Sequence, residues 1–184
     1  MHRACGSHDN FQEMTSTGVE RLEIERESER HSRPGGISRW LDSLPLSHLW
    51  RGHGSAIVLE FGLLTPGTRT RPSGEPGNPH GEFGLMIEWS WRIENAISIV
   101  CGSWSEESLW EPTFALLRNK TVVELSIVGR LPEISVALTE GFYVSSFMTA
   151  DGDPSWALFD QRSDIARWLS VSEGRPRLQQ RSYR

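Results

Sequence analysis

The sequence predicts a mainly β (α+β) fold: an antiparallel meander sheet or a small, partly open barrel of about six to seven strands, with one or two short helices. Apolar and polar residues alternate over residues 83–94. Short apolar runs then recur at even intervals after residue 120, separated by turns rich in Gly, Pro and Asp. No internal repeat and no regular alternation of helices with strands is visible, which favours antiparallel pairing.

The two ends of the chain are polar. Residues 1–36 have no repeating apolar face and are predicted to be a disordered N-terminal segment, with Met1 and Met14 as alternative starts. Residues 37–172 are predicted to form a single mainly β domain, and residues 173–184 a disordered tail. Within the domain, residues 65–82 hold four Pro and four Gly, which predicts a flexible loop.

The elements follow in chain order. Residues 38–43 are predicted as a short helix, ended by Pro45, in a segment that covers one end of the core. Strands are expected over residues 55–64, 83–94 and 96–103. In the second of these, alternation places the following side chains in the core: Leu85, Ile87, Trp89, Trp91 and Ile93.

A helix is predicted over residues 106–119, because Trp110, Phe114 and Leu117 share one helical face. Ser105 is its expected cap, and Pro112 is an alternative first-turn residue. Short strands are then expected over residues 121–128, 133–138, 142–149 and 155–159. One more turn of structure is expected over residues 165–169, where Trp168 docks on the core.

Charge and cysteine content exclude several classes of function. The net charge is −5, and residues 37–159 hold eight basic and fourteen acidic residues, which disfavours nucleic-acid binding. No apolar run is long enough for a signal peptide or a membrane span, so a cytoplasmic protein without membrane association is expected. Cys5 and Cys101 make neither a disulfide framework nor a zinc site, and no metal or cofactor is expected.

Glu60 and Glu88 form the sharpest candidate site. If their strands are antiparallel neighbours, both carboxylates project from one sheet face, with Ser90 and Arg92 continuing the Glu88 row. Two close carboxylates have pKa values that move apart, which allows one to act as an acid and the other as a base. The alternative is an ordinary solvated sheet face, on which Glu is common.

Three tryptophans near element ends, Trp104, Trp110 and Trp156, are candidate partner-contact residues if they are exposed together; otherwise they close the ends of the core. His53 and His80 have no partner at diagnostic spacing. The sequence Asp151-Gly152-Asp153 is interpreted as a hairpin turn, because the later ligands of a calcium loop are missing. No catalytic motif is present, which favours a protein that is not an enzyme.

Several blocks resemble a family of small uncharacterised bacterial proteins. They are LWRGHGSAIVLEFG at residues 49–62, GLMIEWSWRIE at 84–94, GSW at 102–104, LPEISVAL at 131–138 and SFMTADGDPSWAL at 146–158. The resemblance implies a bacterial origin and the limits of the domain, about 49–160. It implies no activity and no site residues.

Two functions are consistent with these observations. The first is a protein-interaction module, either immunity-like or regulatory, whose acidic body attracts a basic partner. The second is a small-ligand-binding or hydrolytic domain on the face that carries Glu60, Glu88 and Arg92, with residues 65–82 as a lid. The sequence contains nothing on oligomeric state.

Overall fold

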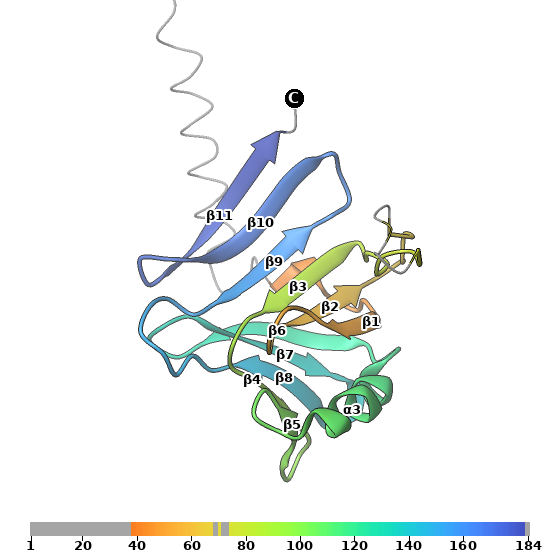
Figure 1. Ribbon diagram of the computed structural model, residues 1–184. Coiled ribbons are helices and arrows are strands. Elements are labelled where there is room, and N and C mark those ends of the chain that lie inside the picture. Colours follow the sequence, from red (N-terminus) through yellow and green to blue (C-terminus); the bar gives the residue numbers. More distant parts are fainter. Residues whose placement is uncertain (1–37, 68–69, 71–73, 183–184) are drawn as a thin grey trace, which may run out of the picture.

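Two antiparallel sheets packed face to face make up the computed structural model, which describes residues 38–67, 70 and 74–182 (Figure 1). This confirms the mainly β, antiparallel prediction. The described residues form eleven strands and no closed barrel, so the expected number of strands was too low. The six-stranded sheet has the order β1 (Leu46–Arg51), β2 (Ile57–Phe61), β3 (Phe83–Ile87), β9 (Trp156–Asp160), β10 (Ile165–Ser172) and β11 (Arg175–Ser182). The five-stranded sheet has the order β5 (Ile99–Gly102), β4 (Trp91–Glu94), β8 (Phe142–Ser146), β7 (Glu133–Leu138) and β6 (Val122–Val128).

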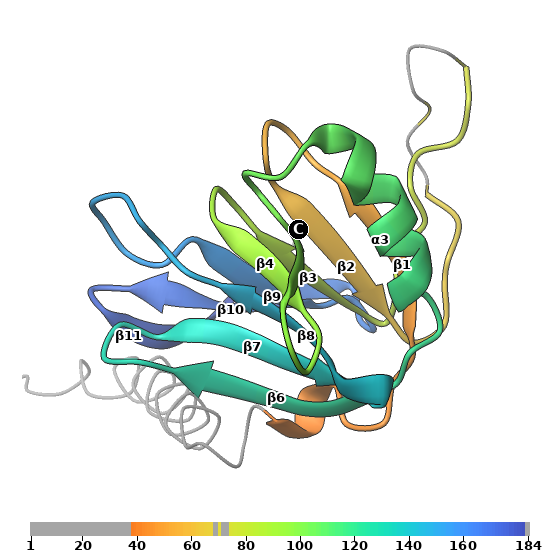
Figure 2. The same cartoon turned by 90° about the horizontal axis from the view of Figure 1, so that it is seen from below.

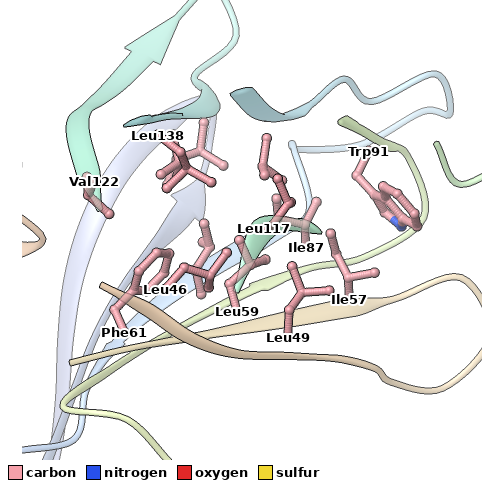
Figure 3. Packing of buried hydrophobic residues seen from close by; sticks show 14 of the residues in the cluster. Leu46, Leu49, Ile57, Leu59, Phe61, Ile87, Trp91, Leu117, Val122 and Leu138 are labelled. Atoms are coloured by element: carbon pink, nitrogen blue, oxygen red, sulfur yellow. The ribbon is translucent and has the colours of Figure 1, made fainter. Parts of the chain in front are cut away.

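The core lies between the sheets. Alternate residues of each strand face inward, so Ile57 and Leu59 of β2 are fully buried together with Leu85 and Ile87 of β3. Figure 3 shows side chains from β1, β2 and β3 packing with Trp91, Leu117 and Leu138 from the other layer and its helix. Burying each such side chain contributes roughly 1.5–3 kcal/mol. Cys101 is among these residues and acts as a small buried apolar group.

The predicted strand over residues 83–94 is two strands in different sheets. Residues 88–90 form a three-residue turn, in which the N–H of Ser90 donates to the carbonyl of Glu88 at 2.8 Å and Trp89 has a φ of +62°. Trp91 and Ile93 are buried as expected, but Trp89 is 63% exposed. Alternation could not show this break, because Ile87 and Trp91, the buried residues on either side of the turn, are four positions apart, which preserves the period of two.

Residues 46–51 form a strand that the sequence analysis missed. The expected helix is reduced to a short 3₁₀ helix, η1 (Ser38–Trp40), and β1 follows Pro45. A register irregularity between Leu46 and His48 leaves Leu46 and Leu49 both buried at a spacing of three. A β-bulge of this kind interrupts the period of two, which explains why alternation did not reveal this strand.

The predicted helix over residues 106–119 is shorter than expected. It comprises a 3₁₀ turn, η2 (Glu107–Leu109), and an α-helix, α3 (Trp110–Leu117), with Pro112 in the first turn. Ser105 does not cap it, because its hydroxyl accepts the N–H of Gly102 instead. The helix contacts both β1 and β5, the edge strands of the two sheets, and so covers one open side of the core (Figure 2).

The predicted disorder of residues 173–184 is wrong for residues 175–182. These form β11, which pairs with β10 along eight positions, and Leu178 packs against the core. The strand carries Arg175, Pro176 and Arg177, and charged residues and proline are typical of the outermost strand of a sheet. The same composition resembles a disordered tail when it is considered without its partner strand.

The remaining segments contain little regular structure. A third 3₁₀ turn, η3 (Thr139–Gly141), joins β7 to β8. In the described part of 65–82, pairing is limited to the bridges Thr65–His80 and Thr70–Pro76. The predicted disordered segment 1–36, with Cys5 and both candidate starts, lies outside the described residues. Within those residues, no helix is long and apolar enough to cross a membrane.

Candidate functional site

The outer face of the six-stranded sheet carries a row of paired residues across five of its strands, and the residues on the first four of these strands are apolar. Trp50 pairs with Val58, Val58 with Met86, Met86 with Ala157, and Ala157 with Ser170. These residues alternate with the buried residues of the same strands, so their side chains point away from the core. A sheet face open to solvent is ordinarily polar, and this row is therefore unusual.

A cavity of about 480 Å³ lies at one end of this row. This volume is within the range of small-molecule sites, roughly 300–1,000 Å³. The β1–β2 turn forms one wall and the end of β3 forms the other. The lining residues are Trp50, Arg51, Gly52, His53, Gly54, Ser55, Ala56, Val58, Met86, Glu88 and Trp89.

Trp89 is held at this cavity in an unfavourable backbone conformation. A positive φ is a true outlier for a bulky residue and costs on the order of 1–3 kcal/mol. The hydroxyl of Ser55 donates to the Trp89 carbonyl at 2.9 Å, and the N–H of Phe147 donates to the Ser90 carbonyl at 3.1 Å. The fold thus fixes a largely exposed indole beside the cavity.

Arg51 is the arginine of the cavity wall, which also includes His53, and its charge is already paired. Its Nη1 lies 2.6 Å from Oε2 of Glu107, and its Nε donates to the Gly54 carbonyl at 3.0 Å. The guanidinium also lies over the ring of Trp110, 4.9 Å from its centroid. The hydrogen bond from Arg51 holds the pKa of the Glu107 carboxyl below its ordinary value.

Glu88 lies between this cavity and a second one. Its backbone N–H donates to the Ser155 carbonyl at 2.9 Å, and its Oε2 accepts the Ser155 hydroxyl at 2.9 Å. The second cavity, of about 420 Å³, shares Glu88 and Met86 with the first and extends toward Phe159 and Trp168. Together the two hollows extend along the outer face from β1 to β10.

Glu60 has a structural position. It is 2% exposed, and its Oε2 accepts the N–H of Gly81 and the amide Nε2 of Gln161, each at 2.9 Å. Nδ1 of His80 lies 3.8 Å from its Oε1. Glu60 therefore fixes the end of the 65–82 loop against β2 and does not line either cavity.

The structure does not bring the four predicted polar residues together. Glu60 pairs with Gly84, four residues before Glu88, which separates the two carboxylates by roughly 13 Å along the strands. Their strands are antiparallel neighbours, but this separation does not bring the two carboxylates together as an acid–base pair. Ser90 is buried in the crossover beside Thr149, and Arg92 lies on β4 of the other sheet, paired with Glu94 at 2.6 Å.

The three candidate contact tryptophans are also separated. Trp104 is 83% exposed, whereas Trp110 and Trp156 are buried. The Trp110 ring meets Trp91 edge to face with centroids 5.0 Å apart, and Nε1 of Trp156 donates to the Pro132 carbonyl at 2.7 Å. Trp110 and Trp156 thus close the ends of the core, which was the alternative interpretation.

Asp151–Asp153 is not a hairpin turn, because it lies in the connection between β8 and β9, which belong to different sheets. Asp153 accepts the N–H groups of Glu173 and Gly174, each at 2.8 Å, and so supports the β10–β11 turn. Across the described residues, no cluster of three or more His, Cys, Asp or Glu is arranged to hold a metal ion.

Sequence reasoning found Glu88 but missed the residues around it. Trp50 and Trp89 were both assigned elsewhere, the first to a covering segment and the second to the core. The polar alternation of residues 83–94 did place Met86 and Glu88 on the face opposite the core, and an exposed Met beside a Glu was the available signal.

Comparison with family models, curated proteins and solved structures finds no match to this chain. The resemblance to a family of small bacterial proteins therefore stays a prediction.

Proposed function

We propose that this protein binds a small, largely apolar molecule in the outer-face cavity between the β1–β2 turn and Trp89. The cavity has a suitable size, apolar walls and a few polar groups at its margin. An enzymatic role has no comparable support, because Glu60 and Glu88 are not placed as an acid–base pair.

The observation that carries the proposal is the conformation of Trp89. Neither burial nor backbone preference explains a tryptophan that is 63% exposed at positive φ. Strained residues of this kind concentrate at ligand sites, where the surrounding structure holds them in place. Binding stabilises such an indole by covering it, since an aromatic ring removes roughly 150–250 Å² from water when it is fully buried.

The test is a nuclear magnetic resonance titration with neutral apolar fragments such as indole and cyclohexanol. We expect the indole N–H signals of Trp50 and Trp89 to shift with dissociation constants near or below about 1 mM. Trp104 is the control, since it is exposed but lies outside the cavity. Shifts confined to Trp104, or no shifts up to about 10 mM fragment, would overturn the proposal.

A protein-interaction role is the second candidate and has a different observation in its favour. Three apolar residues at the β4–β5 end of the five-stranded sheet are exposed: Ile97 by 92%, Ile99 by 60% and Tyr143 by 41%. They line a hollow of about 600 Å³ together with Glu94. Exposed apolar residues with an acidic neighbour are suited to a partner with a basic rim.

This second role is tested by exchanging residues on each face separately. A stoichiometric partner that is lost with Ile97→Asp/Ile99→Asp, but retained with Trp89→Asn, would place binding on the five-stranded sheet. A partner retained by both variants would exclude this face as its site.

A further inference from the structure

We infer that the outer-face cavity recognises a cation, namely an ammonium group carried on an apolar body. This inference rests on the proposed function and specifies the chemical class of its ligand.

Tryptophans from two different segments line the cavity. Trp50 on β1 and Trp89 in the crossover are both lining residues. The face of an indole carries negative electrostatic potential and attracts a cation within about 6 Å of its centroid, and Trp is the most effective residue for this purpose. A quaternary ammonium is especially suited, because its methyl groups also favour the apolar walls.

The charge in the cavity wall is negative. Glu88 uses Oε2 for the Ser155 hydroxyl, and no basic side chain of the described chain pairs with it. The positive charge of Arg51 is paired with Glu107 at 2.6 Å. An anionic ligand would therefore have to displace Glu107 and lie beside Glu88, whereas a cation pairs with Glu88 directly.

The second cavity indicates where the apolar body of the ligand lies. Glu88 and Met86 line both hollows, so an ammonium at Glu88 has apolar surface on either side. On one side are Trp50 and Val58, and on the other are Phe159 and Trp168. An amphipathic amine with its charge near one end fits this arrangement.

The experiment compares two soluble molecules of nearly equal shape: choline, and its neutral carbon isostere 3,3-dimethyl-1-butanol. Both are titrated into the full chain while the indole N–H signals of Trp50 and Trp89 are followed. We expect choline to bind at least about tenfold more tightly, which corresponds to about 1.4 kcal/mol. Glu88→Gln should remove this difference by weakening the binding of choline.

Glu94→Gln is the matched control, because Glu94 is an outward carboxylate on the other sheet. It should leave both affinities unchanged. Equal binding of the two molecules at the cavity, insensitive to Glu88→Gln, would overturn the inference about charge and leave the proposed function intact. Failure of the neutral isostere, indole and cyclohexanol alike to shift these signals would instead overturn the proposed function.

Discussion

Nε2 of Gln161 donates a hydrogen bond of 2.9 Å to Oε2 of Glu60, although the two residues are 101 positions apart in the chain. The bond passes over Gly84, where an added Cβ would lie 2.6 Å from the Gln161 amide. Because Gly84 has no side chain, the amide of Gln161, which follows β9, can reach the buried carboxylate of Glu60 on β2 and donate a hydrogen bond to it.

Gly84→Ala should lower the free energy of unfolding by about 1–3 kcal/mol, because it displaces the amide that satisfies Glu60. Urea denaturation measures the change. The double variant Gly84→Ala/Gln161→Ala tests this explanation. Without the Gln161 amide, the methyl group added at residue 84 has no amide to displace. The loss of stability in the double variant should therefore be smaller than the sum of the losses in the two single variants. Strict additivity would show that Gly84 and Gln161 do not act through this bond.

Trp89→Asn should raise the free energy of unfolding by about 0.5–1 kcal/mol, because Asn accepts the left-handed conformation more readily than Trp. The same change should weaken fragment binding at the cavity. Trp104→Asn, at an exposed residue with no part in the cavity, should leave the affinity unchanged. Thermal denaturation and the fragment titration measure the two effects, and a loss of stability with retained affinity would contradict this account.

Asp160 should make stability depend on pH. It is 6% exposed and accepts two hydrogen bonds of 2.9 Å from Arg162. These hydrogen bonds hold the pKa of the Asp160 carboxyl below the ordinary value of 3.8. A folded-state pKa below the unfolded one adds stability at pH values above about 4, and this is lost as the pH falls through the lowered pKa.

Asp160→Asn should therefore reduce the free energy of unfolding at neutral pH by about 1 kcal/mol, a modest figure because Arg162 is half exposed. It should also flatten the decline of stability as the pH falls below about 4. Glu107→Gln is the control, since its carboxyl is paired with Arg51 at the surface and should affect this decline less. An unchanged pH profile in Asp160→Asn would contradict the assignment.

Trp156→Phe should destabilise the fold by about 1–2 kcal/mol, because it leaves the buried carbonyl of Pro132 without the indole donor. Trp104→Phe, at an exposed position, should change stability by less than about 0.5 kcal/mol. Chemical denaturation measures both variants. Equal effects of the two substitutions would show that the hydrogen bond to Pro132 contributes little.

Leu178→Ala should lower the free energy of unfolding by about 1–2 kcal/mol, because Leu178 is half-buried and packs against the core. Hydrogen exchange offers a direct measurement of the same feature, since the amides of β11 that pair with β10 should be protected. Rapid hydrogen exchange throughout residues 175–182 would show that this segment is disordered and does not pair stably with β10.

The class of the fold and most of its local elements follow from patterns in the amino-acid sequence. Alternation predicted that Leu85, Ile87, Trp91 and Ile93 face the core, and the bounds of β7 match the predicted strand 133–138. These features depend on residues close in the chain, and the period of side-chain burial records them directly.

The number of strands, the division into two sheets and the position of the candidate site depend on tertiary contacts. The β1 bulge, the turn at Trp89 and the pairing of β11 depend on partners far along the chain, which a local pattern does not contain. The register of strand pairing also separates Glu60 from Glu88 by roughly 13 Å. Glu60 is buried at its position in the sheet. The cavity at Trp89 exists for the same reason: its walls come from β1, β2 and β3, and only their packing places the two indoles beside Glu88.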